Sequence, residues 1–290
     1  MPTAPVLVKQ MIRSSMETLT PSERQLADVL LRDYPVAGLQ SITRLASAAG
    51  VSTPTVIRMA RKLGFDGFPD LQERLREEVS EQIKKPISKR DPWQTRAGDE
   101  HVLNLFGRAV SENLHHTLDR LDPEVFDRVA ALLADTSRDV YLVGGRITRS
   151  NADYLFNHLQ IIRPNVTLLS QSANVWPQYL LDMDARSILI VFDIRRYESD
   201  LQKLARLAAD RGCDIVLFTD QWGSPVGKVT DLVFNAQVEA PSSWDSTIAI
   251  MLIVEALVAE VQTARWEESR ERIEELESMF GATRLFRNFN

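Results

Sequence analysis

Four arginine side chains lie in two segments where their guanidinium groups could together bind an anion. Arg146 and Arg149 stand in one segment, and Arg195 and Arg196 stand in the other, each just beyond a short apolar run. Guanidinium groups bind phosphate and carboxylate groups through paired hydrogen bonds, so this pattern favours a site for a small anionic molecule. The alternative is that some of these arginines pair with neighbouring acids or face a second copy of the chain.

The sequence around these arginines contains further residues that suit a binding site. Gly144 and Gly145 predict a tight turn leading into a helix N-terminus, where backbone N–H groups favour an anion. Glu255 lies within the apolar run 253–257, so we expect a buried carboxylate with an arginine partner in this anion site or at an interface. The predicted residues of this small-molecule site are Gly144, Gly145, Arg146, Thr148, Arg149, Ser150, Asp193, Arg195, Arg196, Tyr197, Asp220, Ser224 and Glu255.

A second group of basic residues predicts contact with DNA. Arg44, Arg58, Arg61 and Lys62 lie within residues 34–65, a stretch that has no Asp or Glu. A surface helix normally carries acids as well, so the one-sided charge favours nucleic acid over an ordinary helical hairpin. A protein-interaction module without DNA binding would leave the absence of acids unexplained.

The elements that position these basic residues are two short helices joined by a tight turn. Ala46 is a small residue at the expected helix contact, and Gly50 follows four positions later in the turn. This spacing is typical of the DNA-binding helix-turn-helix. Val56, Ile57, Met59 and Leu63 are expected to form the inner face of the second helix, and Ser52 is expected to cap it. The predicted DNA-binding residues are Arg44, Ser52, Thr53, Thr55, Arg58, Arg61 and Lys62.

The remaining patterns divide the chain into an all-α domain over residues 1–83, a linker over 84–98 and an α/β domain over 99–290. Thr20 and Glu23 form a predicted capping box at the start of a helix in the first domain. Residues 84–98 lack periodicity and contain two prolines. Residues Trp266–Phe280 predict a final helix whose apolar stripe is expected to pack against the domain, with a dimer seam as the alternative.

Within the α/β domain, short apolar runs alternate with amphipathic segments. Runs such as Ile188–Phe192 suit strands that are buried on both faces, so we predict a doubly wound, five-stranded parallel sheet covered by helices. Ligands of such sheets bind beyond the carboxyl ends of the strands, where the strand order reverses. The predicted strands are 139–143, 166–169, 188–192, 215–219 and 232–235.

Composition restricts the class of protein. The net charge of −6 is unevenly divided. Residues 1–97 contain 15 basic and 11 acidic residues, and the remainder contains 19 basic and 29 acidic residues. The positive balance therefore lies with the predicted DNA-binding domain. The single cysteine, Cys213, fits a reducing cytoplasm, and no segment has the pattern of a signal peptide or membrane span. The four histidines meet no metal-ligand spacing, so we expect neither a metal nor a cofactor.

The segment 41–68 resembles the RpiR-type bacterial transcription regulators. The resemblance rests on Val51-Ser52, Thr55-Val56, Arg58, the run Lys62-Leu63-Gly64-Phe65 and Gly67-Phe68, followed by an α/β half similar to a sugar isomerase (SIS) domain. It implies a homodimer or homotetramer that binds a palindromic double-stranded operator under the control of a sugar phosphate. It also implies that Ser52, Thr53, Thr55, Arg58 and Lys62 face DNA.

The loop after the third strand separates this chain from a standard SIS domain. Such domains usually present a Ser-x-Ser-Gly loop after the third strand, where this chain has the run Asp193-Ile194-Arg195-Arg196-Tyr197. A carboxylate, or a phosphate in another orientation, is compatible with this change. The alternative function is a sugar phosphate aldose–ketose isomerase with an accessory helical domain, for which His158 and Glu255 are the candidate bases.

Overall fold

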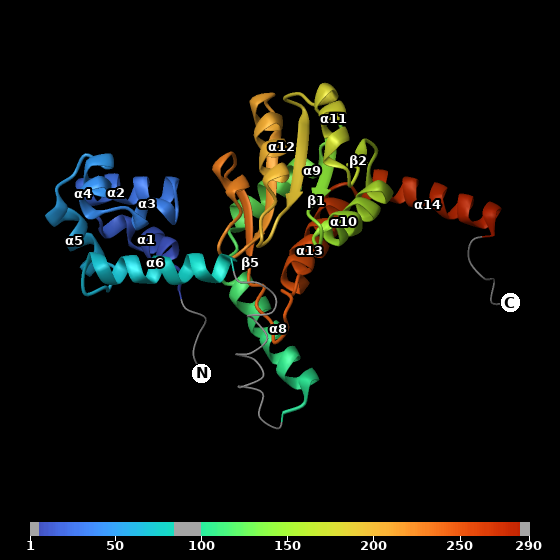
Figure 1. The fold of residues 1–290 in the computed structure, drawn as a ribbon. Coiled ribbons are helices and arrows are strands. Elements are labelled where there is room, and N and C mark those ends of the chain that lie inside the picture. Colours follow the sequence, from blue (N-terminus) through green and yellow to red (C-terminus); the bar gives the residue numbers. More distant parts are fainter. Residues whose placement is uncertain (1–5, 84–99, 285–290) are drawn as a thin grey trace. The chain divides into compact units, whose positions relative to one another are not determined.

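The computed structural model describes residues 6–83 and 100–284, which fall into a helical unit within Met1–Lys85 and an α/β unit within Pro86–Asn290 (Figure 1). The predicted linker at 84–98 lies outside the described residues. Each unit has a hydrophobic core of its own and is treated separately below.

The described part of the first unit is entirely helical, as the sequence predicts. Its core is formed by side chains from every long helix, including Ile12, Leu26, Leu45, Met59 and Leu75. The helices are α1 (Val8–Ser15), η1 (Met16–Thr18), α2 (Pro21–Arg32), α3 (Val36–Leu39), α4 (Ile42–Ala48), α5 (Thr53–Lys62) and α6 (Phe68–Ile83).

Local hydrogen bonds explain where these helices begin and turn. The predicted capping box is confirmed, because Thr20 and Glu23 each accept a hydrogen bond from the other's backbone N–H. The turn between α4 and α5 is also as expected: Gly50 has a φ of +62°, a conformation that glycine adopts without strain. The N–H of Val51 then donates to the carbonyl of Ala46 at 2.9 Å, which closes the turn.

The second unit contains a parallel sheet of five strands in the order β2-β1-β3-β4-β5, which confirms the doubly wound fold. Helices α11 and α12 cover one face, and α9, α10 and α13 cover the other (Figure 1). The strands are β1 (Asp139–Gly144), β2 (Val166–Leu168), β3 (Ser187–Phe192), β4 (Asp214–Asp220) and β5 (Leu232–Ala236). The helices are α8 (Val102–Leu118), α9 (Pro123–Ala134), α10 (Arg149–Ile162), η2 (Ala173–Val175), α11 (Trp176–Asp182), α12 (Ser199–Asp210), η3 (Pro225–Lys228), α13 (Ile248–Ala264) and α14 (Trp266–Thr283).

Buried strands give the sheet its rigidity. Every residue of β3 is buried, as expected for a central parallel strand with helices on both faces. On the α10/α13 face, Phe192 stacks on Phe218 with ring centroids 4.5 Å apart, and Phe218 in turn contacts Phe234 at 4.8 Å. These contacts fix the carboxyl ends of β3, β4 and β5, where the loops of the candidate site begin.

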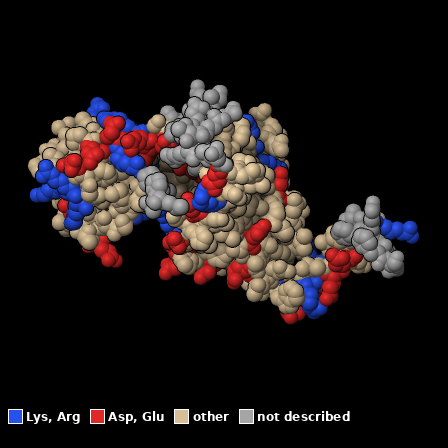
Figure 2. Space-filling view, turned by 90° about the horizontal axis from the view of Figure 1, so that it is seen from below, with Lys and Arg blue, Asp and Glu red and all other residues tan. Residues whose placement is uncertain are grey.

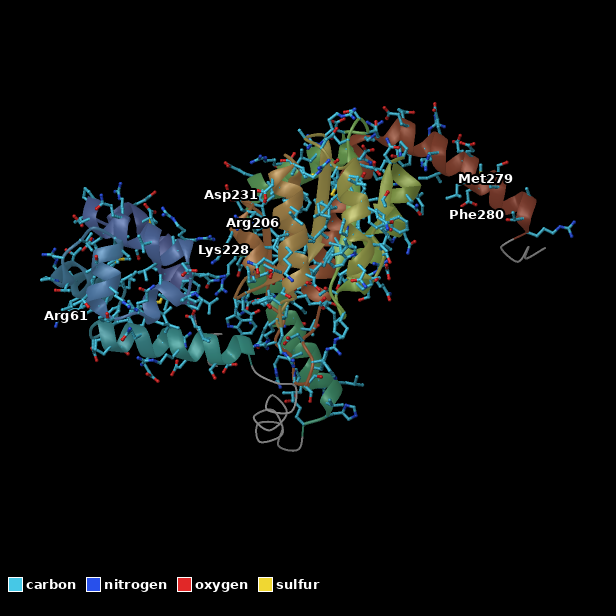
Figure 3. All side chains as sticks on the ribbon, turned by 45° about the horizontal axis from the view of Figure 1, so that its top comes forward. Arg61, Arg206, Lys228, Asp231, Met279 and Phe280 are labelled. Carbon is cyan, nitrogen blue, oxygen red and sulfur yellow. The ribbon has the colours of Figure 1, made fainter. Side chains whose placement is uncertain are left out.

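The final helix, α14, differs from the predicted packing. Its first half packs against α10 and α13, but the helix then extends away from the sheet and carries Met279 and Phe280 near its end (Figure 3). Trp266, predicted to lie in the buried stripe, is 51% exposed, while Ile273 and Leu276 are half-buried. None of the four stripe residues is buried, so the stripe lies at the margin of this unit and not in its core.

Candidate nucleic-acid interface and effector site

The outward face of α5 is the candidate DNA-reading surface. Residues of an α-helix advance by 100° each, so Thr53, Ile57 and Arg61 share one side of α5, with Pro54 and Arg58 beside them. All five are exposed or half-buried, while Val56, Met59, Ala60 and Leu63 on the opposite side are buried. Arg44 is exposed on the preceding helix α4, and basic side chains gather on this unit's surface (Figure 2). Arg61 points outward from the helix (Figure 3).

Ile57 corrects the sequence interpretation. It was expected to complete the inner face of α5, but its side chain lies outside the core cluster and is half-buried at the surface. The register explains this, because Ile57 lies at the edge of the buried face, turned by about 160° around the helix axis from Met59. An apolar side chain on a DNA-reading face can contact the methyl group of thymine.

Thr55 and Ser52 are placed differently from the prediction. The Thr55 side chain is 4% exposed, so it does not project from the helix. Its hydroxyl lies 3.0 Å from the Ser52 hydroxyl and accepts a hydrogen bond from Arg58 at 3.2 Å. Ser52 therefore contacts a side chain instead of capping the helix through its hydroxyl. These contacts position Arg58 at the surface.

Lys62 makes its polar contacts within its own unit. Its ammonium group lies 3.1 Å from Oε2 of Glu23 and also donates to the carbonyl of Thr18. Burial alone would raise the pKa of Glu23, but hydrogen bonds from Thr20 and the Lys62 charge lower it below its usual value. The Lys62–Glu23 pair joins the end of α5 to the start of α2, which is a stabilising contact within the fold.

The strand order places the candidate effector site between β1 and β3. These strands are neighbours, and their following helices α10 and α12 lie on opposite faces, so the order reverses here. The loop after β1 contacts the end of β3 directly. Thr148 donates to the carbonyl of Phe192 at 2.6 Å, and the N–H of Gly145 donates to the same carbonyl at 3.2 Å. Thr148 is consequently buried in this contact rather than open to a ligand.

The β1–α10 loop fits closely around its own backbone. A Cβ atom on Gly144 would lie 2.6 Å from the carbonyl oxygen of Thr148, so a side chain cannot be added without moving the turn. A Cβ atom on Gly145 would lie 2.8 Å from Oε1 of Glu198, and that oxygen accepts a hydrogen bond from the N–H of Arg146 at 2.7 Å. Gly144 is therefore needed for the tight turn itself, whereas a side chain at Gly145 would displace the carboxylate of Glu198.

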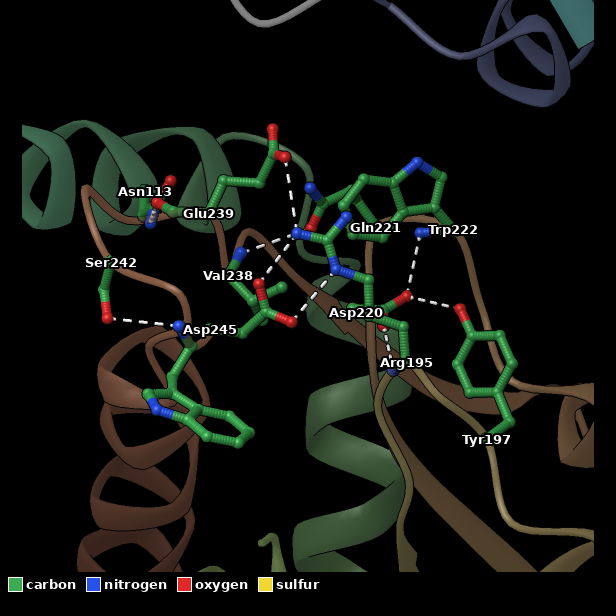
Figure 4. A network of polar contacts seen from close by, with 11 residues as sticks. Asn113, Arg195, Tyr197, Asp220, Gln221, Trp222, Val238, Glu239, Ser242 and Asp245 are labelled. Atoms are coloured by element: carbon green, nitrogen blue, oxygen red, sulfur yellow. Dashed lines mark hydrogen bonds and ion pairs between the residues drawn. The ribbon is translucent and has the colours of Figure 1, made fainter. Parts of the chain in front are cut away.

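Arg195 belongs to a buried network and not to an open anion site (Figure 4). Its guanidinium donates to both carboxylate oxygens of Asp245, at 3.0 and 2.8 Å, approaches Glu239 at 3.4 Å and lies 3.8 Å from the ring centroid of Trp222. The side chains of Arg195 and Asp245 are only 2% and 7% exposed. Burial alone would lower the pKa of Arg195, but Asp245 and Glu239 raise it, so the guanidinium remains charged.

The other three arginines divide into one paired and two exposed side chains. Arg149 donates to Asp153 at 2.8 Å and to the carbonyl of Leu169, so it links α10 to the end of β2. Arg146 and Arg196 are exposed, and neither makes an ion pair with any described residue. Arg146 lies 6.0 Å from the ring of exposed Trp244. Arg146 and Arg196 are therefore the guanidinium groups that remain open to an anion.

Two buried carboxylates hold the loops after β3 and β4. Asp220 accepts hydrogen bonds from the N–H of Arg195 at 2.6 Å and the hydroxyl of Tyr197 at 2.7 Å, and from the N–H groups of Trp222 and Gly223. Burial raises its pKa, and burial together with Asp220 raises the pKa of Tyr197 well above the usual range.

Asp193, at the end of β3, is the second of these carboxylates. It is 2% exposed and accepts a hydrogen bond from the hydroxyl of Ser224. Burial raises the pKa of Asp193 to about 7, despite the hydrogen bonds from Ser224 and from the N–H of Glu198. Asp193, Tyr197, Asp220 and Ser224 thus form the rigid base of the site.

Glu255 is not the buried carboxylate that the sequence predicts. It is exposed on α13 and accepts a hydrogen bond from the hydroxyl of Tyr154 on α10 at 3.1 Å. The ring of Tyr154 lies 4.5 Å from that of His158, so the two candidate bases share one helix–helix surface. The apolar run around Glu255 is explained by its neighbours at 253, 254 and 257, which are buried on the other sides of α13.

The described residues contain neither a metal-binding cluster nor a membrane-spanning helix. In residues 6–83 and 100–284, no three His, Cys, Asp or Glu side chains are grouped so as to hold a metal ion. None of the described helices combines the length and the apolar character that crossing a membrane requires.

Comparison with known proteins identifies both units. Residues 6–82 match the family model "Helix-turn-helix domain, rpiR family", and residues 132–260 match the SIS domain. The chain is 25% identical to the HTH-type transcriptional regulator HexR of Pseudomonas aeruginosa over 288 residues, which covers 95% of this chain and 96% of that protein. It is 23% identical to the regulator RpiR of Escherichia coli over 232 residues, or 77% and 73% of the two chains.

Solved structures show the same fold. The sugar isomerase domain of an RpiR transcription factor from Sphaerobacter thermophilus matches with a TM-score of 0.57 and 22% identity, covering 61% of this chain and 97% of that one. The NanR protein of Vibrio vulnificus, solved with ManNAc-6P, matches with a TM-score of 0.57 and 18% identity, covering 97% and 99%.

Proposed function

Because the chain belongs to the RpiR family of helix-turn-helix transcriptional regulators, we propose that α5 reads an operator and that an anionic metabolite bound at the β1/β3 crevice controls the affinity for it. The observation that carries this proposal is the pair of exposed arginines, Arg146 and Arg196, beside the point where the strand order reverses. Effector binding shifts the population between states that differ in operator affinity.

The DNA half of the proposal rests on the outward face of α5. Arg44, Arg58 and Arg61 supply positive charge for phosphate groups, and Arg58 is close enough to the helix start to approach base edges. We assign Lys62 a structural role through Glu23, and Thr55 the role of positioning Arg58. We further propose that the operator is palindromic and that a homodimer or homotetramer binds it, as the resemblance of the sequence implies.

The effector half rests on charge and on chemistry in the loops. Arg146 and Arg196 favour a phosphate or carboxylate, and NanR, a relative in fold, was solved with the sugar phosphate ManNAc-6P. We propose a phosphorylated or carboxylated sugar derivative as the effector class. An isomerase activity is not favoured, because Glu255 lies exposed against Tyr154 and the named relatives are transcriptional regulators.

The direct test is selection of bound fragments from the source genome with the purified protein, followed by salt titration on the best fragment. A specific site whose affinity falls steeply with salt supports the regulator. Arg58→Ala should weaken operator binding by about 1–3 kcal/mol, whereas Arg76→Ala, an exposed arginine paired with Glu73 on α6, should not. Sugar phosphates and sugar acids are then titrated against the protein–operator complex. Failure to select any specific fragment would refute the DNA-binding role.

A further inference from the structure

The β1–α10 loop already binds an anionic group, and this group is the side chain of Glu198. Of the loop's backbone donors, the N–H of Gly145 is satisfied by Thr148 at 3.0 Å and by the carbonyl of Phe192. The N–H of Arg146 is satisfied by Oε1 of Glu198 at 2.7 Å. Fifty-two residues separate Glu198 from Arg146, so this contact joins the loops on the two sides of the crevice.

Backbone contacts place Glu198 beside the β1–α10 loop. Glu198 is the N-cap residue of α12, and its own N–H donates to Oδ1 of Asp193 at 3.3 Å. Its carboxylate lies against Gly145, where an added Cβ would approach Oε1 to 2.8 Å and Cδ to 3.1 Å. Leu201, one turn further along α12, lies against the same glycine and fills the space below.

We propose that Glu198 is a specificity-determining residue of the effector site, whose carboxylate occupies the anion position of the β1–α10 loop and excludes phosphate from it. This inference rests on the proposed function and specifies where in the effector site the anionic group of the effector binds. A phosphate at the N–H of Arg146 would have to occupy the place of Oε1, and at any nearby point it would be repelled by a like charge within about 4 Å. The anionic group of the effector is therefore bound outside the loop, by the guanidinium groups of Arg146 and Arg196.

The test uses inorganic phosphate as the probe and the full chain without DNA. Phosphate affinity is measured by titration calorimetry for the wild type, Glu198→Ala, Glu198→Gln and the control Asp200→Asn. Asp200 is a fitting control because it is an exposed acid in the first turn of the same helix, paired with Lys203. Its replacement removes the same charge from α12 without opening the loop.

Glu198→Ala is expected to bind phosphate at least tenfold more tightly than the wild type, and Glu198→Gln severalfold more tightly, because the amide removes the charge but keeps the shape. Asp200→Asn should change the affinity by less than twofold. Equal or weaker phosphate binding by both Glu198 variants would overturn the proposal, as would an equal gain in Asp200→Asn. The phosphate titration contains no operator DNA, so it tests the role of Glu198 alone. The proposed function is refuted separately, if no metabolite changes the affinity for DNA. Should Glu198→Ala not fold, Glu198→Gln decides the outcome alone.

Discussion

Replacing Arg195 by alanine should destabilise the α/β unit by about 3–5 kcal/mol, whereas the same change at Arg196 should alter its stability by less than about 0.5 kcal/mol. The two arginines are adjacent in sequence, yet their surroundings differ. The Arg195 guanidinium is 2% exposed and bound to Asp245 through two hydrogen bonds, while Arg196 is exposed. Removing Arg195 leaves the Asp245 carboxylate buried without its main partner, and this desolvated charge accounts for most of the cost.

The assay is urea unfolding followed by tryptophan fluorescence. All five tryptophans lie after residue 92, so the signal reports the α/β unit and not the helical one. With a slope of about 2–3 kcal/mol per molar urea, the expected loss moves the midpoint of Arg195→Ala down by about 1–2.5 M. Trp222 stacks on Arg195, so its emission in the native state should change as well. Arg196→Ala is the matched control, since it removes the same side chain one position away.

A double-mutant cycle with Asp245→Ala tests the cause. If the cost comes from an unpaired buried charge, the double variant should be less destabilised than the sum of the two single variants, by at least about 1 kcal/mol. Additive losses would show that Arg195 and Asp245 act independently, and a midpoint for Arg195→Ala equal to that of Arg196→Ala would refute the structural role altogether. Conversely, Arg196→Ala should lose the effector response while keeping effector-free operator binding.

Three further predictions concern single side chains. Ile57→Ala should change the stability of the helical unit by less than about 0.5 kcal/mol, because the side chain lies outside the core. It should also relax the base preference at one operator position. Replacing thymine by uracil at that position should weaken operator binding by the wild type but not by the variant. Lys62→Ala should destabilise the helical unit by up to about 1 kcal/mol in thermal unfolding, since it removes the partner of Glu23, whereas Arg61→Ala should weaken operator binding without that loss. Asp193→Asn should flatten the pH dependence of stability between about pH 4 and 7. The pKa of Asp193 in the folded protein is about 7 and exceeds the unfolded value, so the wild type binds more protons when folded. The wild type therefore loses stability as the pH rises through this window. If the difference in urea midpoint between the wild type and Asp193→Asn stays constant across that pH range, the raised pKa of Asp193 is contradicted.

The order of elements and the sheet could be predicted because they depend on local patterns. The helix-turn-helix followed from Ala46 and Gly50, and the parallel sheet followed from buried runs such as residues 188–192. The sequence could not resolve which side of α5 Ile57 would take, since an apolar residue at the edge of a helical stripe fits either face. Its neighbours Val56 and Met59 fixed the register only once the helix was packed.

The sequence could locate the candidate effector site but could not show which of its arginines pair with an acid and which stay exposed. The reason is that the pairing residues lie far apart in the sequence. Arg195 finds Asp245 fifty residues later, and Arg146 meets Glu198 fifty-two residues later, so no local pattern reports either contact. By contrast Arg149 pairs with Asp153 at helical spacing, a contact that the sequence could have revealed. A cluster of guanidinium groups at the end of a sheet therefore indicates where charge gathers. Which of those charges a ligand meets depends on acids supplied by other loops, and here those acids leave Arg146 and Arg196 exposed.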